Sequence, residues 1–254
     1  MLTSECVQKF QNQKVNILFK VQWLFLYLKW VFVLQLIMAD SNKKLKILCL
    51  HGYRQNSFSF KQKMNGFRKC IKNIAELVFI EAPHAISGDS NSDCDQEIGQ
   101  TFSWWFCDET NNFSSLTECE VAKGFKESID LISQTFKTLG PFDGILGFSQ
   151  GAAIVALICC LKECHEFAYD FKFVILISGF KSLAKCHQYL YKNPATTKSL
   201  FVYGLNDTCI SKERSGLFSE VFLMPTIVVH DGGHYVPCHS DVKKQYVAFL
   251  KSCF

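Results

Sequence analysis

Six short apolar runs, separated by longer segments with helical periodicity, constrain the fold of this chain more than any other feature of its sequence. The runs lie at residues 45–50, 76–81, 143–148, 172–178, 199–204 and 225–230. The segments that we predict to be helical lie near residues 57–73, 118–138, 150–163, 183–191, 212–222 and 239–252. Strands that alternate with helices are typical of βαβ units with right-handed crossovers. The sequence therefore predicts an α/β fold with a mostly parallel, six-stranded central sheet and helices on both faces.

Length and charge limit the classes of protein to which the chain can belong. Its 254 residues suit one large domain, or one domain with a tail, and are enough to bury a substantial core. The net charge of +4, spread over 27 basic and 23 acidic residues, gives no dense cationic stripe of the kind that a phosphate backbone attracts. We therefore do not expect nucleic acid as a partner.

The thirteen cysteines do not have the pattern of a disulfide framework or of a structural metal site. Their number is odd, and several lie inside apolar runs, such as Cys49, Cys159 and Cys160. No CxxC pair occurs, and the cluster that ends at Cys164 lacks a second pair of ligands at metal spacing. We predict buried free thiols, no metal, and a reducing compartment, the cytosol or the nucleus.

The first forty residues differ from the rest of the chain. Residues 17–38 approach the roughly 20 apolar residues that span a bilayer. Lys29 near the middle costs about 2.5–3.5 kcal/mol on insertion, whereas each Leu, Ile, Phe or Val returns about 0.3–0.6 kcal/mol, so insertion is marginal. Met38, followed by a polar stretch and then the first strand, resembles a natural start. Residues 1–40 are therefore interpreted as an extension outside the native protein, a membrane anchor or a structured cap. Residues 41–254 are interpreted as the globular domain. We expect membrane contact only through residues 17–38.

One stretch does not follow the alternation of strands and helices. Residues 84–117 are rich in Ser, Asp, Asn and aromatic residues and include the segment TFSWWF. A long irregular loop in a compact domain is usually a binding or lid element. We expect this loop to border a ligand site.

The segment Gly147-Phe148-Ser149-Gln150-Gly151 follows an apolar strand and opens a helix of small residues. This is the G-x-S-x-G nucleophile elbow in the context that it requires, a strained turn between strand and helix that exposes the serine hydroxyl. Glycine is needed on both sides because neighbouring backbone passes close by. The alternative is an ordinary strand-to-helix turn that happens to carry a serine.

A nucleophilic serine needs a base, and the base needs an acid that orients it. His234 lies in a Gly-rich loop after the last predicted strand, and Asp207 follows the strand before it. The chain order Ser, Asp, His is that of the α/β-hydrolase fold. We predict that His234 accepts the proton of Ser149 and that Asp207 accepts the Nδ1–H of His234. The alternatives are a surface-loop histidine and a turn-capping aspartate.

Acyl transfer also needs two donors for the oxyanion. The first predicted donor is the backbone N–H of Gln150, directly after the nucleophile. The second comes from the loop after the first strand, with the N–H of Tyr53 as first choice and that of Arg54 as second choice. His51, at the start of this loop, is expected to brace it as a core histidine.

Read together, these segments resemble the family of serine hydrolases often abbreviated FSH, which includes the eukaryotic ovarian-cancer-associated esterases. The matching segments are ILCLHGYRQN, EAPH, SWWF, GPFDGILGFSQGAA, FKFVILISGF, LFVYGLNDTCISKERS and GGHYVP, from about residue 45 to 250. The resemblance implies an α/β-hydrolase that acts on carboxylic esters, with long-chain acyl esters as candidate substrates and Ser149, Asp207 and His234 at the triad positions. It does not cover residues 1–37, and Ser211 stands where the family usually has Pro.

The sequence therefore favours a serine hydrolase that cleaves small-molecule or lipid-like acyl esters through an acyl-enzyme, without a cofactor. The first alternative is an acyl-protein thioesterase, which shares the machinery. The second is a catalytically silent binding protein on the same fold, which is disfavoured because all three triad positions carry competent residues. Arg54, Trp104, Trp105 and Phe106 are candidates for lining the substrate pocket, and packing of the aromatic residues against the core is the alternative. The sequence does not indicate which oligomeric state the protein has.

Overall fold

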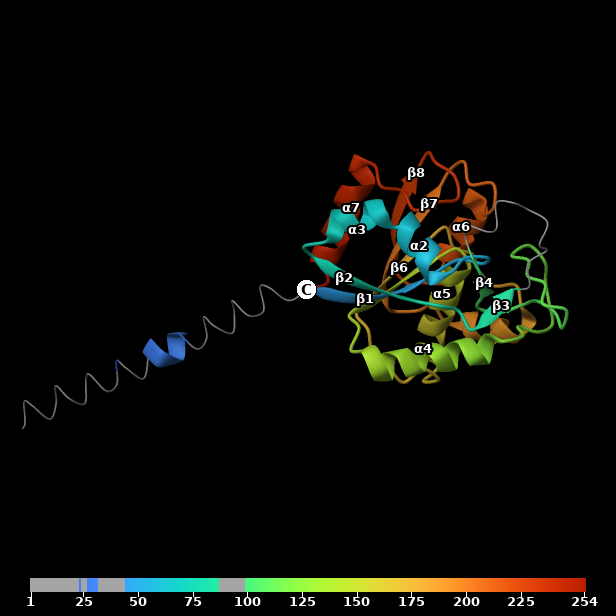
Figure 1. Ribbon diagram of the computed structural model, residues 1–254, viewed down its shortest axis with the longest axis horizontal. Coiled ribbons are helices and arrows are strands. Elements are labelled where there is room, and N and C mark those ends of the chain that lie inside the picture. The colour runs from blue at the N-terminus through green and yellow to red at the C-terminus, as the bar shows by residue number, and fades with distance from the viewer. Residues whose placement is uncertain (1–22, 24–26, 32–43, 87–98) are drawn as a thin grey trace, which may run out of the picture. The chain divides into compact units, whose positions relative to one another are not determined.

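The computed structural model describes Trp23 and residues 27–31, 44–86 and 99–254 (Figure 1). Residues 45–254 form one compact unit, separate from residues 1–44. In the N-terminal unit, Trp23 and residues 27–31 are helical, and most of the stretch 17–38 lies outside the described part of the chain. Among the residues that the structure describes, no helix is both long and apolar enough to cross a membrane.

A six-stranded parallel sheet forms the centre of residues 45–254, as the sequence predicts. Its strand order is β2-β1-β5-β6-β7-β8, and every neighbouring pair is parallel. The strands are β1 (Leu45–Leu50), β2 (Ala75–Ile80), β5 (Gly144–Phe148), β6 (Phe173–Ile177), β7 (Lys198–Gly204) and β8 (Thr226–His230). All residues of β5 and β6 are buried, because a central parallel strand is covered on both faces. The carboxyl ends of these strands therefore meet at one edge of the sheet.

Successive side chains of each strand enter two different cores. In β1, Leu48 and Leu50 pack in one core and Ile47 and Cys49 in the other, as the two-residue repeat of a strand requires. The first core is closed by α4 (Phe125–Leu139), α5 (Gln150–Glu163), the 3₁₀ helix η1 (Lys185–Lys192) and α6 (Lys212–Ser219). The second is closed by α2 (Ser57–Lys63), α3 (Asn65–Ile71) and α7 (Ser240–Lys251), on the opposite face in Figure 1.

Three predicted helices differ from those observed. The segment 57–73 is two helices, because the chain turns at Met64, and Phe60, Met64 and Phe67 all pack in the same core. The segment 118–138 becomes helical only at Phe125, since the preceding residues include a bridge between Phe106 and Lys123. The segment near 183–191 is a 3₁₀ helix rather than an α-helix.

The predicted irregular loop contains a small sheet of its own. Strands β3 (His84–Ile86) and β4 (Thr101–Ser103) pair antiparallel, and residues 87–98 between them lie outside the described residues. Phe102 also pairs with Gln55, in the loop after β1. This contact ties the start of the aromatic segment to the loop that was predicted to supply an oxyanion donor.

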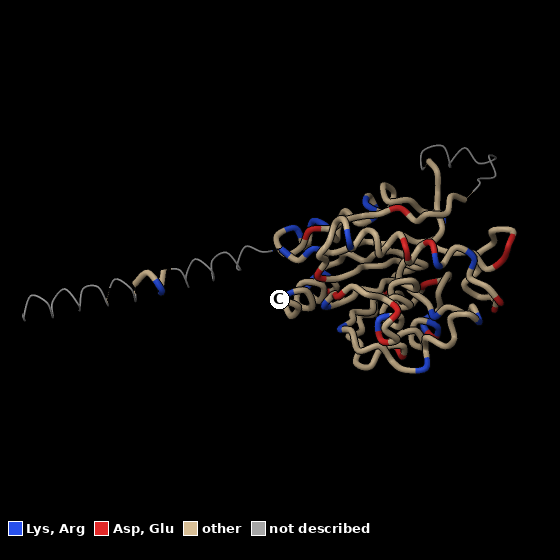
Figure 2. Tube along the Cα trace, turned by 90° about the horizontal axis from the view of Figure 1, so that it is seen from below, with Lys and Arg blue, Asp and Glu red and all other residues tan. Residues whose placement is uncertain are grey.

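The charged side chains are mixed in sign and the described cysteines are free, as the composition of the sequence predicts. Basic and acidic residues are interspersed along the trace of residues 45–254 (Figure 2). The cysteines that the structure describes are free, and Cys49, Cys159, Cys160 and Cys253 are buried. Burial raises the pKa of these four thiols, which keeps them protonated and unreactive.

Candidate active site

Ser149 lies in a strained turn between β5 and α5, at the carboxyl edge of the sheet. Its backbone has a φ of 54° and a ψ of −117°, which is unusual for a residue with a side chain. A Cβ atom on Gly147 would lie 2.3 Å from the carbonyl oxygen of Gly151, and one on Gly151 would lie 2.3 Å from that of Leu50. Both glycines are therefore required by close backbone contacts, and the turn projects the Ser149 hydroxyl from the sheet.

The structure brings the three predicted triad side chains together. The Nε2 atom of His234 lies 3.0 Å from the hydroxyl oxygen of Ser149, and its Nδ1 atom lies 2.8 Å from Oδ2 of Asp207. Ser149 follows β5, Asp207 lies in the loop after β7, and His234 lies in the loop after β8. The contacts form one continuous hydrogen-bonded path from hydroxyl to carboxylate, which is the arrangement a serine nucleophile and its base need.

The loops that carry the acid and the base are bonded to each other. The backbone N–H of Leu205 donates to the carbonyl of His230, and that of Asn206 donates to Gly232. A Cβ atom on Gly204 would lie 2.1 Å from the carbonyl oxygen of Gly232, so only glycine permits this approach. The separation between the acid and the imidazole is thus set by backbone contacts as well as by their own hydrogen bond.

The Asp207 carboxylate is fully buried and is held ionised by its partners. Its Oδ1 atom accepts the backbone N–H groups of Cys209 and Ile210, at 2.9 and 2.8 Å. Burial acts to raise the pKa of this carboxyl, but the hydrogen bonds from His234 and from the two N–H groups outweigh it, so the pKa lies below its ordinary value. An ionised carboxylate at this position favours the tautomer of His234 that donates from Nδ1.

Asp143, which the sequence placed at the other end of the nucleophile strand, is far from this chemistry. Its side chain accepts the backbone N–H of Lys46 and pairs with Lys172 at 3.0 Å. These contacts link the starts of three neighbouring strands. Its role is therefore structural.

The two candidate oxyanion donors lie on either side of Ser149. Gln150 is the first residue of α5, so its N–H has no partner within the helix. The N–H of Arg54, the second choice from sequence, donates to Phe102 at 3.1 Å and is therefore occupied. Within the described part of the chain the N–H of Tyr53 has no hydrogen-bond acceptor. A Cβ on the preceding residue, Gly52, would lie 3.2 Å from that of Ser149, so this loop passes directly over the nucleophile.

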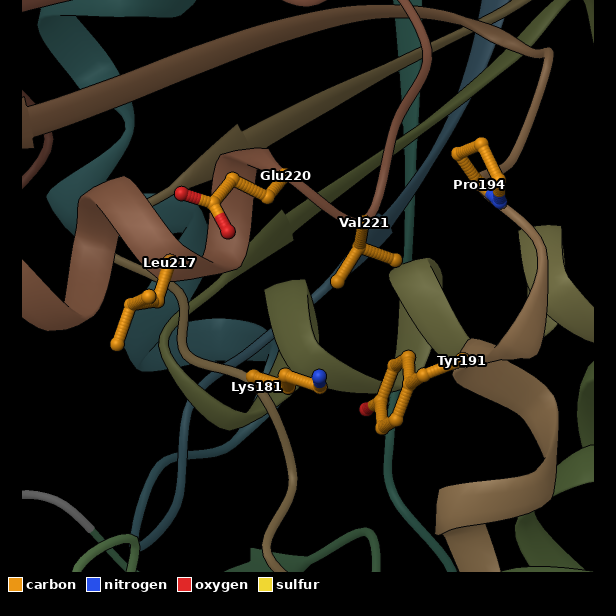
Figure 3. Close-up of a pocket in the computed structure, with 6 residues that line it drawn as sticks. All are labelled: Lys181, Tyr191, Pro194, Leu217, Glu220 and Val221. Carbon is orange, nitrogen blue, oxygen red and sulfur yellow. The ribbon is translucent and has the colours of Figure 1, made fainter.

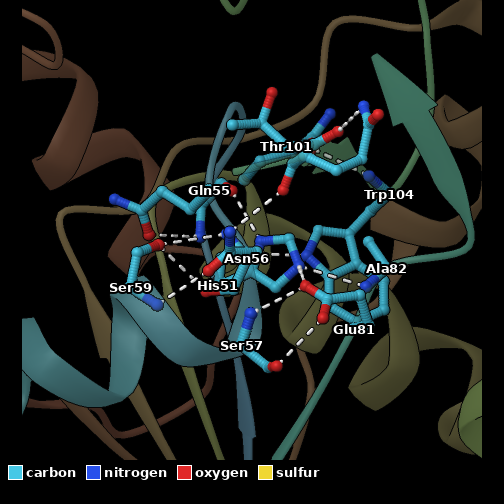
Figure 4. Close-up of polar contacts among 12 residues, drawn as sticks. His51, Gln55, Asn56, Ser57, Ser59, Glu81, Ala82, Thr101 and Trp104 are labelled. Carbon is cyan, nitrogen blue, oxygen red and sulfur yellow. Dashed lines mark hydrogen bonds and ion pairs between the residues drawn. The ribbon is translucent and has the colours of Figure 1, made fainter. Parts of the chain in front are cut away.

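His51 braces this loop through both of its ring nitrogens (Figure 4). Nε2 accepts the backbone N–H of Ala82 at 3.0 Å, and Nδ1 lies 2.8 Å from the carbonyl oxygen of Gly52. Because Nε2 accepts, the ring proton is on Nδ1 and is donated to Gly52. Burial lowers the pKa of His51, so the ring is neutral near pH 7. The sequence predicted the bracing role but could not identify these two partners.

The aromatic segment reaches the site through the side chain of Gln150. Oε1 of Gln150 accepts the backbone N–H of Trp104 at 3.0 Å, and Nε2 donates to the carbonyl of Trp105 at 2.9 Å. The indole N–H of Trp104 donates to the carbonyl of His51 at 2.7 Å. These bonds connect the first residue of α5 to the loop after β1, so both candidate oxyanion donors share one buried support.

The four predicted pocket residues do not line the pocket beside His234. Trp104, Trp105 and Phe106 are only 0%, 1% and 3% exposed, because they pack in the core, which is the alternative that the sequence left open. The cavity that Trp105 lines is only about 10 Å³. Arg54 is exposed and does not line the pocket beside His234.

A pocket of about 360 Å³ opens beside the imidazole. It is lined by Gln55, Phe60, Lys63, Phe148, His234, Tyr235 and Val236. The ring of Phe148 lies 4.9 Å from that of His234, so an apolar wall continues up to the triad. Apart from His234, sequence patterns did not single out these residues, because α2, the end of β5 and the loop after β8 meet only in the fold. A second pocket, of about 290 Å³, lies between Lys181, Tyr191 and α6 and includes no triad residue (Figure 3).

The fold and the geometry of the site define an α/β-hydrolase with a serine in the nucleophile elbow. The model of a family described as serine hydrolase (FSH1) matches residues 38–246. Esterase OVCA2 of Danio rerio is 42% identical over 219 residues, which cover 82% of this chain and 96% of the relative. Esterase OVCA2 of Xenopus tropicalis is 41% identical over 221 residues, which cover 84% and 94%. The chain therefore belongs to the FSH1 family of serine hydrolases and is a hydrolytic enzyme.

Solved structures support the same fold. The crystal structure of esterase PE8 superposes with a TM-score of 0.58 at 17% identity and covers 83% of this chain and 93% of that one. Acyl-protein thioesterase 2 of Zea mays superposes with a TM-score of 0.57 at 18% identity, over 82% and 95%. At these identities the likeness concerns the fold alone.

Proposed function

We propose that the protein hydrolyses carboxylic esters through an acyl-enzyme formed on Ser149. His234 removes the hydroxyl proton as Ser149 attacks the acyl carbonyl, and the resulting imidazolium is stabilised by Asp207. The N–H groups of Tyr53 and Gln150 bind the developing oxyanion. His234 then gives its proton to the departing alcohol, and water, activated by the same imidazole, releases the acid.

One observation carries this proposal, namely the unbroken path of hydrogen bonds from Ser149 through His234 to Asp207. A surface-loop histidine or a turn-capping aspartate would not need this alignment. The N–H of Tyr53 has no acceptor among the described residues, and the neighbouring Gly52 passes close to Ser149; this supports the same chemistry, because an oxyanion needs donors that are not already occupied.

The pocket beside His234 favours esters with an apolar group on the side of the scissile bond that faces the imidazole. Phe60, Phe148 and Val236 supply apolar walls, and Lys63 and Gln55 supply polar groups. Acyl esters of lipid-like character fit this lining, and the reaction needs no cofactor. The free thiols of the described part of the chain favour the cytosol or the nucleus as its compartment.

The direct test is covalent labelling of the purified full-length protein with a fluorophosphonate probe, which reacts with an activated serine. We expect labelling of the wild type and none of Ser149→Ala. Equal labelling of both proteins, or labelling of neither, would contradict the assignment of Ser149.

A series of aryl esters and acyl thioesters of increasing chain length then separates the remaining alternatives. A higher kcat/KM for the esters supports the proposal, and a consistent preference for thioesters identifies the protein as a thioesterase with the same machinery. A protein that is labelled by the probe but turns over neither series would be a binding protein on this fold.

A further inference from the structure

A cysteine lies beside the triad, where the proposed mechanism does not use its thiol. The thiol of Cys209, a carboxylate oxygen of Asp207 and a ring nitrogen of His234 all lie within 4.8 Å of one another. Among the described residues this is the one group of three metal-ligating side chains that approach so closely. Cys209 is exposed, so solvent reaches the group, whereas the Asp207 carboxylate is buried.

We infer that Asp207, Cys209 and His234 form an inhibitory site for a thiophilic divalent cation, with Zn²⁺ as the ion that fits best. Thiolate, imidazole and carboxylate are the three ligand types that protein zinc sites use, and three protein ligands leave a fourth position for water. The site is distinct from a resident cofactor, because the ion would bind in competition with catalysis.

The distances suit the ion with little movement. Bonds of about 2.0–2.3 Å to a tetrahedral zinc place its ligand atoms roughly 3.3–3.7 Å apart. Nδ1 of His234 and Oδ2 of Asp207, now 2.8 Å apart, need to open slightly, and the sulfur of Cys209 needs to approach by about 1 Å or less. The backbone N–H of Cys209 already bonds to Oδ1 of Asp207, which keeps the two side chains on one turn.

Binding removes the hydrogen bond on which the base depends. The cation takes the lone pair of Nδ1 in the other tautomer of His234, in which the ring proton has moved through solvent from Nδ1 to Nε2, and only the proton of the Cys209 thiol is released. Nε2 then carries the ring proton and has no lone pair facing Ser149, so His234 can no longer accept the proton of the Ser149 hydroxyl. The effect on turnover rests on the proposed function, whereas the binding of the ion does not.

The experiment compares the wild type with Cys209→Ser and with the matched control Cys164→Ser, in which another exposed thiol is removed. Ester hydrolysis is measured against Zn²⁺ concentration, relative to the rate of each protein in EDTA. We expect EDTA-reversible inhibition of the wild type and of Cys164→Ser. For Cys209→Ser the inhibition constant should rise by at least the ~10–100-fold that even the loss of an outer-shell partner causes at metal sites.

A second measurement needs no turnover. Co²⁺ added to the full-length protein should give a thiolate-to-metal charge-transfer band in the wild type, in Cys164→Ser and in Ser149→Ala, but not in Cys209→Ser. Equal zinc sensitivity of wild type and Cys209→Ser, or an unchanged cobalt band in Cys209→Ser, would overturn the site. Absence of any ester turnover in EDTA would instead contradict the proposed function, and the cobalt spectrum alone would then decide whether the site exists.

Discussion

The peptide between Gly52 and Tyr53 gives the sharpest test of how the oxyanion donors are positioned. A trans peptide is planar, so its carbonyl and its N–H point in opposite directions. Nδ1 of His51 lies 2.8 Å from the Gly52 carbonyl oxygen, and this bond fixes the plane of the peptide. It therefore also fixes the direction of the Tyr53 N–H, the proposed donor above Ser149.

Two substitutions of His51 separate this function from simple bracing of the loop. The amide nitrogen of Asn lies about where Nδ1 lies in His, so His51→Asn can keep the bond to Gly52 and lose the bond from Ala82. The amide oxygen of Gln lies about where Nε2 lies, so His51→Gln can keep the bond from Ala82 and lose the one to Gly52. Each variant removes one buried hydrogen bond, which is expected to destabilise the fold by about 1–3 kcal/mol.

The two variants should differ in catalysis although they are similarly destabilised. Complete removal of an oxyanion donor lowers kcat by about 10²–10³, and misalignment of the Tyr53 N–H in His51→Gln should lower it by about 10–100-fold, or 1.4–2.7 kcal/mol. His51→Asn should remain within about threefold of the wild type. The assay is kcat and KM on an aryl ester, at a temperature where urea unfolding shows both variants to be folded. Equal loss of kcat in the two variants would refute the argument from the peptide plane.

Further predictions concern the acid, a buried histidine and the glycine of the elbow. Asp207→Asn should lower kcat by roughly 10⁴, because the amide favours the wrong tautomer of the base. The pKa of Asp207 is lowered in the folded protein, so the stabilisation that its ionised form provides should be lost as the pH falls below about 4. Urea unfolding of Asp207→Asn should lack this acid-dependent part of the stability. Burial lowers the pKa of His187 to about 4, so on acidification the unfolded chain binds a proton before the folded one. The free energy of unfolding should therefore fall by about 2 kcal/mol between pH 7 and pH 5 because of this group. In urea titrations, His187→Phe should remove that part of the pH dependence. Gly147→Ala places a Cβ 2.3 Å from a backbone oxygen and should lower the melting temperature or prevent folding, whereas Gly216→Ala, in open space within α6, should stabilise by about 0.5–1 kcal/mol.

The sheet and the strand ends that carry the triad could be predicted because both follow from local patterns. Each run of apolar residues marks a strand of the parallel sheet, and the loops that follow parallel strands at their carboxyl ends must lie at one edge. Ser149, Asp207 and His234 each follow such a run, and the structure places His234 within hydrogen-bond distance of both Ser149 and Asp207. Their catalytic roles remain a prediction until the labelling and kinetic experiments are done.

Helix boundaries were less predictable, because they depend on contacts that the sequence does not show. The segment 57–73 has the pattern of one helix, and Phe60, Met64 and Phe67 even have the spacing of a single helical face, so this pattern does not reveal that the chain turns at Met64. The start of α4 at Phe125 depends on the bridge from Lys123 to Phe106, a partner seventeen positions earlier in the chain.

The aromatic segment shows why residue type alone does not tell whether a side chain lines a pocket or packs in the core. Trp104, Trp105 and Phe106 have the chemistry of an acyl site, but their backbone groups are the partners of a fully buried Gln150 side chain, and the segment must be buried to provide them. The same glutamine offers its own N–H as an oxyanion donor. The aromatic residues therefore support the site without lining it, because they hold the first turn of α5 at a fixed distance from the loop of His51. We therefore propose that substrate binds instead in the pocket between α2 and the loop that carries His234.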